Sequence, residues 1–444
     1  MAKEAARRNR DRLAADSVRL GKFTVVRVGD AVGEAFEKGY AFHELQAQKE
    51  DIIKRKEELE TRKQELTKLK RLNKRKSAAQ NNSALNAILE DDGIDVEMDT
   101  DLDLIAEQHA IAMHAERLKK EEAGFAEKEK LLDAERGSHE KELRRVQCED
   151  KSRYYRDLPL LGEGRYSLLK LLGQGGFSEV WLALDLFTLE EVAVKIHQLN
   201  SAWSEDRQRA FVRHAKRELE IHRAIAHPRV VKLVGCFDIS NDAFATILEY
   251  CRGTDLDEIL KKTKNGLTEK EAKPILLQIL SGLRFLSTIT IGQEKKTIIH
   301  YDLKPANILF DEMGDVKITD FGLSKVIDGD SDGTSIDQTS HGAGTYWYLP
   351  PECFTKDKSK VRFIICRISA KVDVWSVGVI YYQMLYGKRP FGEGLTQHTI
   401  YKDGTILNAR QVDFPSNSDP KVNKISDEAK DFIRGCLTYD QNLR

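Results

Sequence analysis

The sequence has no run of the roughly 18 apolar residues that a membrane-spanning helix requires, so we expect no membrane span. It contains only six cysteines, none of them spaced as a CxxC pair, and this usage fits reduced thiols in an intracellular compartment best. The basic N-terminus has no apolar core behind it, so no signal peptide is expected. The formal net charge of −1 argues against bulk capture of nucleic acid, and we expect no direct nucleic-acid binding.

Charge is present in abundance but is unevenly distributed. The 444 residues are too many for one compact fold, so two or three regions are expected. Residues 1–76 contain 21 Lys and Arg against 13 Asp and Glu, whereas residues 77–110 contain nine acidic residues and no Lys or Arg. An acidic block can pair with a basic neighbour or form a solvated linker. Because turn-forming residues crowd the acidic stretch, we interpret residues 77–103 as a linker and the polar, basic residues 1–33 as disordered.

Apolar residues recur every seven positions on both sides of this linker, in residues 34–76 and 104–150. The repeating residues are Leu45, Ile52, Leu59, Leu66, and then Leu104, Ile111, Leu118, Phe125 and Leu132. A seven-residue repeat keeps one stripe of a helix facing a partner, so both stretches predict coiled-coil helices. The second core row of the first stretch is mostly Lys, Arg or Gln, which also fits a single solvated helix. The two helices can pack on each other or on a second chain, and the sequence leaves this choice open.

The pattern changes at about residue 164. Short runs of β-branched and aromatic residues come first, as in residues 191–196 and 230–237, and apolar helical patterns follow, as in residues 274–286. This order predicts an α+β domain with a small sheet-rich lobe and a larger helical lobe.

A glycine-rich segment opens this domain with the letters LGQGGFSEV at residues 172–180. Glycines let the backbone approach phosphate oxygens without an intervening Cβ, although the segment alone fits a plain hairpin equally well. Fifteen residues after Val180, the run VAVK ends at Lys195. Strand alternation puts Ala193 and Lys195 on one face, so the amine can reach phosphates that the loop covers. By itself, Lys195 also fits an ordinary surface lysine.

The decisive segment is IHYDLKPANIL at residues 299–309. In it, Asp302 can accept the proton of an attacking hydroxyl, Lys304 can neutralise charge on the transferred phosphoryl group, and Asn307 can bind a metal ion. Thirteen residues after Asn307, the triplet DFG begins with Asp320, whose carboxylate can hold Mg²⁺ on the nucleotide phosphates. The four signals in this order indicate phosphoryl transfer rather than isolated turn and cap residues.

Together the motifs resemble the eukaryotic protein kinase domain over residues 166–444. The resemblance implies a bilobal fold, with a β-rich N-lobe and a helical C-lobe, and it implies ATP and Mg²⁺ as cofactors. Preceded by the long coiled-coil helices, the kinase domain is expected at residues 164–444. Its usual last helix does not appear before Arg444, so a truncated C-terminal end is expected.

The resemblance also assigns roles to individual residues. The nucleotide-binding residues that it implies are Leu172, Gly173, Gly175, Gly176, Val180, Ala193, Lys195, Glu218, Glu249, Cys251, Asp255 and Leu309. The catalytic residues are Asp302, Lys304 and Thr345, and the metal ligands are Asn307 and Asp320.

Several of these roles involve pairs of residues. By resemblance, Glu218 pairs with Lys195, and the backbone of Glu249 and Cys251 binds adenine next to Leu248, the gatekeeper.

Two further structural roles are implied: Glu352 forms a buried ion pair with Arg444, and Asp373 braces the catalytic loop. Lys304, two residues after the catalytic aspartate, and Thr345 are typical of serine/threonine kinases.

The resemblance narrows to the Tousled-like kinases. The segments that carry it are GGFSEV at 175–180, HYDLKP at 300–305 and KVDVWSVGV at 371–379, with GYAFHEL at 39–45 and LKKEEA at 118–123 outside the catalytic domain. It implies a nuclear enzyme that self-associates through coiled coils and phosphorylates histone H3–H4 chaperones during chromatin assembly.

One departure bears on regulation. Tyr301 replaces the arginine that commonly precedes the catalytic aspartate and grips a phosphate in the activation loop, so control by a single phosphate is in doubt. The alternative function is a non-catalytic scaffold, in which the helices assemble chromatin partners and the kinase fold serves as a docking surface.

Overall fold

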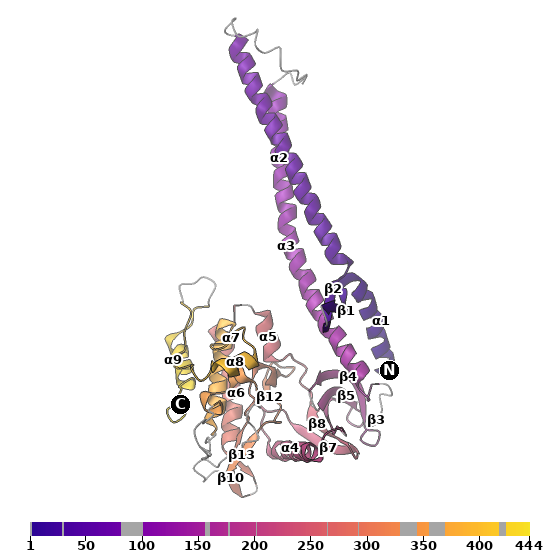
Figure 1. Ribbon diagram of the computed structural model, residues 1–444, viewed down its shortest axis with the longest axis vertical. Helices are drawn as coiled ribbons and strands as arrows, with labels where there is room; N and C mark the ends of the chain where they lie inside the picture. Colours follow the sequence, from indigo (N-terminus) through magenta and orange to yellow (C-terminus); the bar gives the residue numbers. More distant parts are fainter. Residues whose placement is uncertain are drawn as a thin grey trace. The chain divides into compact units, whose positions relative to one another are not determined.

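The structure is a computed structural model that describes residues 2–28, 31–80, 101–155, 160–175, 178–200, 202–263, 265–291, 293–328, 344–354, 369–416 and 423–444. The chain divides into two compact units, Met1–Arg156 and Asp157–Arg444. Each unit is described by itself (Figure 1). In the part of the chain that the structure describes, no helix has the length and apolar character needed to cross a bilayer.

The first unit begins with ordered structure where we expected disorder. Its elements are helix α1 (Ala2–Leu20), strands β1 (Gly21–Val28) and β2 (Ala31–Lys38), and helices α2 (Tyr40–Gln80) and α3 (Asp101–Lys151). The expectation of disorder for residues 1–33 is wrong, because apolar side chains from several elements pack together and order this region. Leu13 and Leu20 of α1 are buried, and Phe23 of β1 packs edge-on against Phe36 of β2.

A close approach of backbone completes this N-terminal assembly. A Cβ at Gly39 would lie 2.4 Å from the carbonyl oxygen of Arg19, so only glycine fits where α2 begins beside the end of α1. His139 of α3 contacts the Gly21 carbonyl oxygen through Nε2 at 3.0 Å. Arg19 forms an ion pair of 2.5 Å with Glu135. Residues far apart in sequence therefore hold α1 and the hairpin against α3.

Helices α2 and α3 run side by side within the one chain (Figure 1). Their heptad stripes pack against each other. Leu45 and Ile52 pack with Leu118 and Phe125, and Leu66 packs with Leu104 and Ile111, while Leu59 borders both clusters. Of the two arrangements that the sequence left open, the structure shows the intramolecular one. Both helices extend into the expected linker, so residues 77–80 and 101–103 are helical, and residues 81–100 lie outside the described residues. The expected start at residue 34 is wrong, because residues 34–38 pair with β1 as part of β2 and α2 begins at Tyr40.

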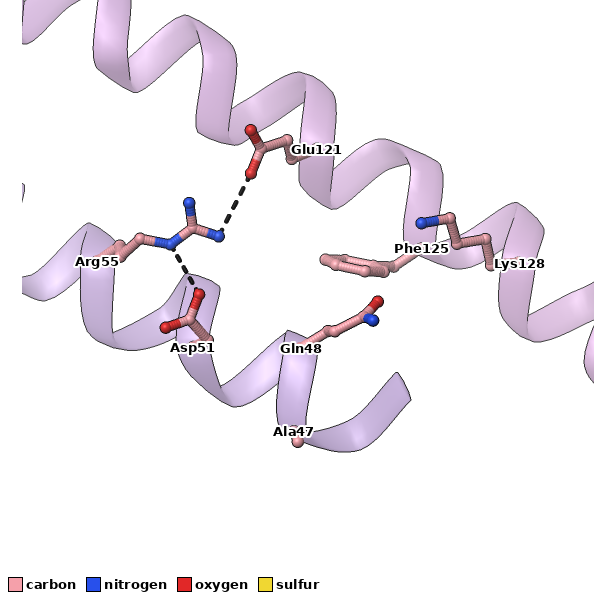
Figure 2. Close-up of a pocket in the computed structure, with 7 residues that line it drawn as sticks. All are labelled: Ala47, Gln48, Asp51, Arg55, Glu121, Phe125 and Lys128. Carbon is pink, nitrogen blue, oxygen red and sulfur yellow. Dashed lines mark hydrogen bonds and ion pairs between the residues drawn. The ribbon is translucent and has the colours of Figure 1, made fainter. Parts of the chain in front are cut away.

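Ion pairs between the helices explain the polar second row of the heptads. Lys49 lies 2.7 Å from Glu129, and Lys56 lies 2.6 Å from Glu122. Lys56 follows Lys49 by seven residues, whereas Glu122 precedes Glu129 by seven, as expected for antiparallel helices. Figure 2 shows Arg55 between Asp51 of its own helix and Glu121 of α3, at 2.9 and 3.3 Å. These long side chains flank the apolar seam and set the antiparallel register of α2 against α3.

The second unit starts with an antiparallel sheet of six strands in the order β3-β4-β5-β6-β8-β7. Its elements are β3 (Leu160–Leu161), β4 (Tyr166–Gln174), β5 (Ser178–Asp185), β6 (Glu191–Gln198), helix α4 (Glu205–Ala224), β7 (Leu233–Ser240) and β8 (Ala243–Glu249). Alternation along the strands buries Leu168, Trp181, Val194 and Ile247 in the core of this lobe.

A larger helical lobe follows. Its α-helices are α5 (Leu256–Lys262), α6 (Glu269–Ser287), α7 (Lys371–Tyr386), α8 (Gln397–Asp403) and α9 (Asp427–Cys436). Its strands are β9 (Ile289–Ile291), β10 (Glu294–Ile299), β11 (Ile308–Phe310), β12 (Val316–Ile318) and β13 (Lys325–Asp328). Short 3₁₀ turns are η2 (Pro305–Asn307), η4 (Tyr346–Tyr348) and η5 (Pro351–Cys353). The sheet-first, helix-second order confirms the expected α+β fold class.

Helix α7 forms the centre of the helical lobe. It is apolar on all sides, and Val372, Trp375, Val379 and Met384 are completely buried. The small hairpin β11–β12 carries the end of the IHYDLKPANIL segment, so it places the predicted catalytic residues at the edge of this lobe.

Candidate active site

A cavity of about 730 Å³ lies beside the glycine-rich turn between β4 and β5. Most of the predicted nucleotide-binding residues line it. Those at its wall are Leu172, Gly173, Gly175, Val180, Ala193, Lys195, Glu218, Glu249, Cys251, Asp255 and Leu309. Gly176 lies outside the described residues. Both predicted metal ligands, Asn307 and Asp320, also reach this wall, so segments far apart in the sequence meet at one space.

One end of the cavity is apolar. Ala193 lies opposite Leu248 in the β6–β8 pair, and Val180 and Leu309 pack against the same cluster. Burial raises the pKa of the Cys251 thiol to about 12, so this cysteine is a neutral, apolar part of the wall at physiological pH. A flat apolar slot bordered by strand backbone is suited to an aromatic base.

The opposite end is charged. Lys195 Nζ lies 2.5 Å from Glu218 Oε1 on α4 and 3.2 Å from Asp320 Oδ1. Burial disfavours the ammonium ion, but the carboxylates of Asp320 and Glu218 outweigh it, so the pKa of Lys195 is raised. The same contact overcomes burial at Asp320 and lowers the pKa of its carboxyl group. Lys195 and Asp320 are therefore both ionised at neutral pH.

A second hydrogen-bonded group surrounds Asp302. Lys304 Nζ donates to Asp302 Oδ2 at 2.6 Å, and the Thr345 hydroxyl and backbone N–H donate to Oδ1 at 2.9 and 3.1 Å. Lys304 also lies 3.2 Å from Thr345 Oγ1. The structure thus joins the three predicted catalytic residues, although Thr345 is 43 residues away in sequence.

Backbone strain and a buried carboxylate fix the loop that holds Asp302. Tyr301 has a φ of 70° and Asp320 a φ of 69°, a region that non-glycine residues rarely adopt. Asp373 of α7 accepts hydrogen bonds from the backbone N–H groups of His300 and Tyr301 at 2.8 and 3.0 Å. Deep burial raises the pKa of Asp373 despite these bonds. Asp373 therefore supports the strained turn, as the resemblance implied.

Sequence reasoning missed a row of three mutually tilted rings, those of His222, Phe321 and His300. The Phe321 ring lies 5.2 Å from the ring of His222 on α4 and 5.2 Å from that of His300. His222 contacts the Val231 carbonyl oxygen through Nε2 at 2.7 Å, and because a carbonyl only accepts, Nε2 carries the proton. A single histidine within a helix has no motif around it, so no local signal pointed to this role.

A second missed feature is a lysine beside Tyr301. The Nζ atom of Lys325 is buried, lies over the Tyr301 ring and has no hydrogen-bond partner among the described residues. Burial, assisted by the positive charge of Arg217, lowers the pKa of Lys325 to about 8. The tyrosine that replaces the common arginine thus covers a buried cation.

The predicted metal ligands fit Mg²⁺ in their chemistry. Asn307 Nδ2 donates to the Asp302 carbonyl oxygen at 2.8 Å, which leaves the amide oxygen available for a cation. One of the Asp320 oxygens bonds Lys195 and the other remains available. No cluster of three or more His, Cys, Asp or Glu residues suited to a metal occurs within the described ranges. Mg²⁺ commonly uses one or two protein ligands and completes its shell with water and phosphate oxygens, so this small donor set is suitable.

Residues 166–444 match the family model described as the protein kinase domain, which covers more than half of the chain. The chain belongs to the protein kinase family. Kinase domains use ATP and a divalent metal ion, generally Mg²⁺.

Curated relatives resemble the helices as well as the kinase domain. The chain is 42% identical over 435 residues to the serine/threonine-protein kinase TOUSLED of Arabidopsis thaliana, which covers 98% of this chain and 58% of that protein. It is 44% identical over 453 residues to the human serine/threonine-protein kinase tousled-like 1, and the alignment covers 98% of this chain and 57% of the human protein. The mouse serine/threonine-protein kinase tousled-like 2 is 44% identical over 442 residues, and the alignment covers 98% of this chain and 59% of the mouse protein. The chain therefore spans less than three-fifths of the length of these three relatives.

The kinase domain also contains the ion pair that the resemblance implied. Arg444 donates to both carboxylate oxygens of Glu352, at 2.8 and 3.2 Å, and its side chain is completely buried. The guanidinium also lies 5.0 Å from the centroid of the Trp375 ring on α7. This bidentate contact links the segment after η4 to the end of the helical lobe.

Proposed function

We propose that the chain is a Tousled-like serine/threonine kinase that transfers the γ-phosphate of ATP to protein hydroxyl groups. The observation that carries the proposal is a charged group at the cavity wall and a second charged group that Asn307, itself at this wall, connects to it by a hydrogen bond to the Asp302 carbonyl oxygen. Lys195, Glu218 and Asp320 form the first group, and Asp302 with Lys304 the second. Phosphoryl transfer depends chiefly on alignment and on cations placed where negative charge develops, and these residues provide both.

Each residue has a separate task in this mechanism. The Lys195 ammonium, oriented by Glu218, binds nucleotide phosphate oxygens. Asn307 and Asp320 would hold Mg²⁺, which would supply positive charge to neutralise the phosphates. Asp302 orients the substrate hydroxyl and accepts its proton at a carboxylate oxygen, and Lys304, 2.6 Å away, offsets negative charge on the phosphoryl group. Thr345 keeps the Asp302 carboxylate in one orientation.

Transfer of ³²P from ATP to a protein substrate tests this activity. Asp320→Ala removes a metal ligand and the partner of Lys195, and Asp302→Asn removes the proton acceptor. Each change is expected to lower kcat by at least about 10²–10³-fold. Glu312→Ala serves as the control, because this exposed glutamate lies outside the cavity, and it should leave kcat unchanged. Equal transfer by wild type and by Asp320→Ala would support the scaffold alternative.

The proposed substrates are histone H3–H4 chaperones, and the proposed location is the nucleus. The support is the 42–44% identity to Tousled and Tousled-like kinases over 98% of the chain. Incubation with a recombinant H3–H4 chaperone and Mg-ATP, followed by phosphosite mapping, tests the substrate. Imaging of the tagged chain in cells tests the location, and exclusion from nuclei would contradict it.

We also propose that the chain forms homo-oligomers through its coiled-coil helices. The support is the heptad seam and its matched ion pairs, because α3 of a second copy offers α2 the same apolar and charged surface as its own α3. Light scattering on the full chain tests this, and a monomer at micromolar concentration would contradict it.

A further inference from the structure

The outer face of helix α4 carries a row of exposed cations. Arg209, Arg213 and Lys216 are spaced by four and three residues, so they lie one above another on one side of the helix. All three side chains are exposed. Glu218 and His222 point the other way, toward Lys195 and Phe321. The helix therefore has a catalytic side and an outer, basic side, and we call the three outer residues the α4 basic face.

Two of the three cations have no anionic partner in the described part of the chain. Arg209 forms an ion pair of 2.6 Å with Glu205. Neither Arg213 nor Lys216 makes an ion pair or a side-chain hydrogen bond with any residue that the structure describes. Glu220 is the acidic residue nearest to them along the same side of the helix, and it offsets one charge. When Arg217 is included, this side carries four exposed cations against the three exposed carboxylates of Glu205, Asp206 and Glu220, so one net positive charge remains.

The position of α4 relates this face to the substrate. Arg217, next to Lys216 in sequence, acts electrostatically on Lys325, the first residue of β13 and five residues after Asp320. Helix α4 thus lies close to the segment that follows the metal-binding aspartate. A negatively charged segment on this helix would be held near the reacting groups.

We propose that the α4 basic face binds an acidic segment of the protein substrate, in which Asp, Glu or phosphorylated residues pair with Arg213 and Lys216. This inference rests on the proposed function and adds a substrate class to it. Nucleic acid fits the face less well, because single strands need exposed aromatic rings for stacking. The ring of Trp203, just before this helix, is covered by the guanidinium of Arg207 at 4.5 Å and by the ring of Phe211 at 5.6 Å.

Docking of this kind changes affinity more than chemistry. Exposed ion pairs each contribute about 0.2–1 kcal/mol and are screened by salt within about 8 Å at physiological ionic strength. Because the contacts are the same before and during phosphoryl transfer, they lower KM and leave kcat unchanged.

The test compares two peptides with the same phosphoacceptor sequence, one of which has a tail of about six acidic residues. The variant Arg213→Glu/Lys216→Glu reverses the charge of the face. The control Lys270→Glu/Lys273→Glu makes the same change in charge, at the same spacing, on exposed residues of α6. Wild type and control should show a KM about three- to tenfold lower for the tailed peptide, and the α4 variant should lose this preference with kcat intact.

Fluorescence anisotropy of the labelled tailed peptide, measured without ATP, separates this inference from the proposed activity. Binding that is lost in the α4 variant and kept in the control supports the basic face even if no phosphate is transferred. Equal peptide binding by the variant and wild type would overturn the inference. Tighter binding of a DNA oligonucleotide than of the acidic peptide, lost in the same variant, would also overturn it.

Discussion

The Lys325 ammonium lies 4.2 Å from the centroid of the Tyr301 ring. Tyr301 directly precedes the predicted catalytic aspartate, Asp302, in sequence. The ring provides attraction for the cation but no hydrogen bond, and the described residues provide no other acceptor. Two opposing energies therefore meet at one site. Burying the charge is unfavourable, and stacking on the ring recovers only about 0.5–2 kcal/mol.

We predict that Lys325→Met stabilises the protein by about 1 kcal/mol at pH 7, because methionine fills the site without a buried charge. In the folded chain the pKa of Lys325 is lowered from 10.5 to about 8. Between these two values the unfolded chain binds a proton that the folded chain does not, so wild-type stability rises with pH. The advantage of Lys325→Met should thus shrink from pH 8 to 10.5. Urea denaturation at pH 7 and 9.5 measures it, and an advantage that grows with pH would contradict the assignment.

His222 is predicted to position α4 through its hydrogen bond to Val231. His222→Leu keeps an apolar contact with Phe321 but leaves a buried carbonyl oxygen unpaired, which costs about 1–3 kcal/mol. Because Glu218 lies one turn away, kcat should fall roughly tenfold while KM for the peptide stays constant. His222→Gln can still donate a hydrogen bond and should recover part of kcat. Equal kcat for the Leu and Gln variants would show that the hydrogen bond does not affect kcat.

Burial also predicts acid sensitivity. It lowers the pKa of His222, and it lowers the pKa of His197 to about 3, so both rings are neutral in the folded chain at pH 7. Below their ordinary pKa of about 6.5, the unfolded chain takes up protons that the folded chain does not. Stability should therefore fall between pH 7 and 5, and less steeply in His222→Leu. Thermal unfolding at both pH values measures the difference, and identical slopes would contradict it.

The Glu352–Arg444 pair should be sensitive to a change that preserves charge. Arg444→Lys loses the two-pronged contact and the stacking over Trp375, so we expect a loss of about 2–3 kcal/mol. Arg434→Lys makes the same change at a half-exposed side chain and should cost less than about 0.5 kcal/mol. Urea denaturation compares the two, and similar losses would mean that the buried geometry has no special effect.

The helical hairpin provides a pair of neighbouring test positions. Ile52 is 2% exposed in the seam between α2 and α3, whereas Ile53 is 54% exposed. Ile52→Asp buries an unpaired carboxylate and should cost at least about 3 kcal/mol in the first unit, while Ile53→Asp should change stability by less than about 0.5 kcal/mol. Circular dichroism during thermal unfolding of the full chain reports the loss of helix. Equal melting of the two variants would contradict the seam.

The site residues were predicted best where the function requires a short sequence motif. The glycine-rich turn, Lys195, Asp302 and Asp320 each lie in a short motif. The structure brings the turn, Lys195 and Asp320 to one cavity and places Asp302 next to it, hydrogen-bonded through its carbonyl oxygen to Asn307 at the cavity wall. His222 and Lys325 have no such motif, because their roles depend on partners such as Phe321 and Tyr301 that tertiary structure alone supplies.

The N-terminal residues escaped prediction for a related physical reason. Leu13, Leu20, Phe23 and Phe36 belong to one helix and two strands, so no single period connects them. The heptads predicted the helices α2 and α3 correctly but did not identify their partner. That choice depends on charges that match only when both helices are compared in antiparallel register.

The distribution of these charges restricts which helices can associate. The flank of α2 that meets α3 carries Lys49 and Lys56, and the facing flank of α3 carries Glu122 and Glu129. Two α2 helices brought together along this side would place lysine against lysine, and two α3 helices would place glutamate against glutamate. Like-charge repulsion therefore disfavours both symmetric pairs and selects a mixed pair of one basic and one acidic helix, whichever molecule supplies each.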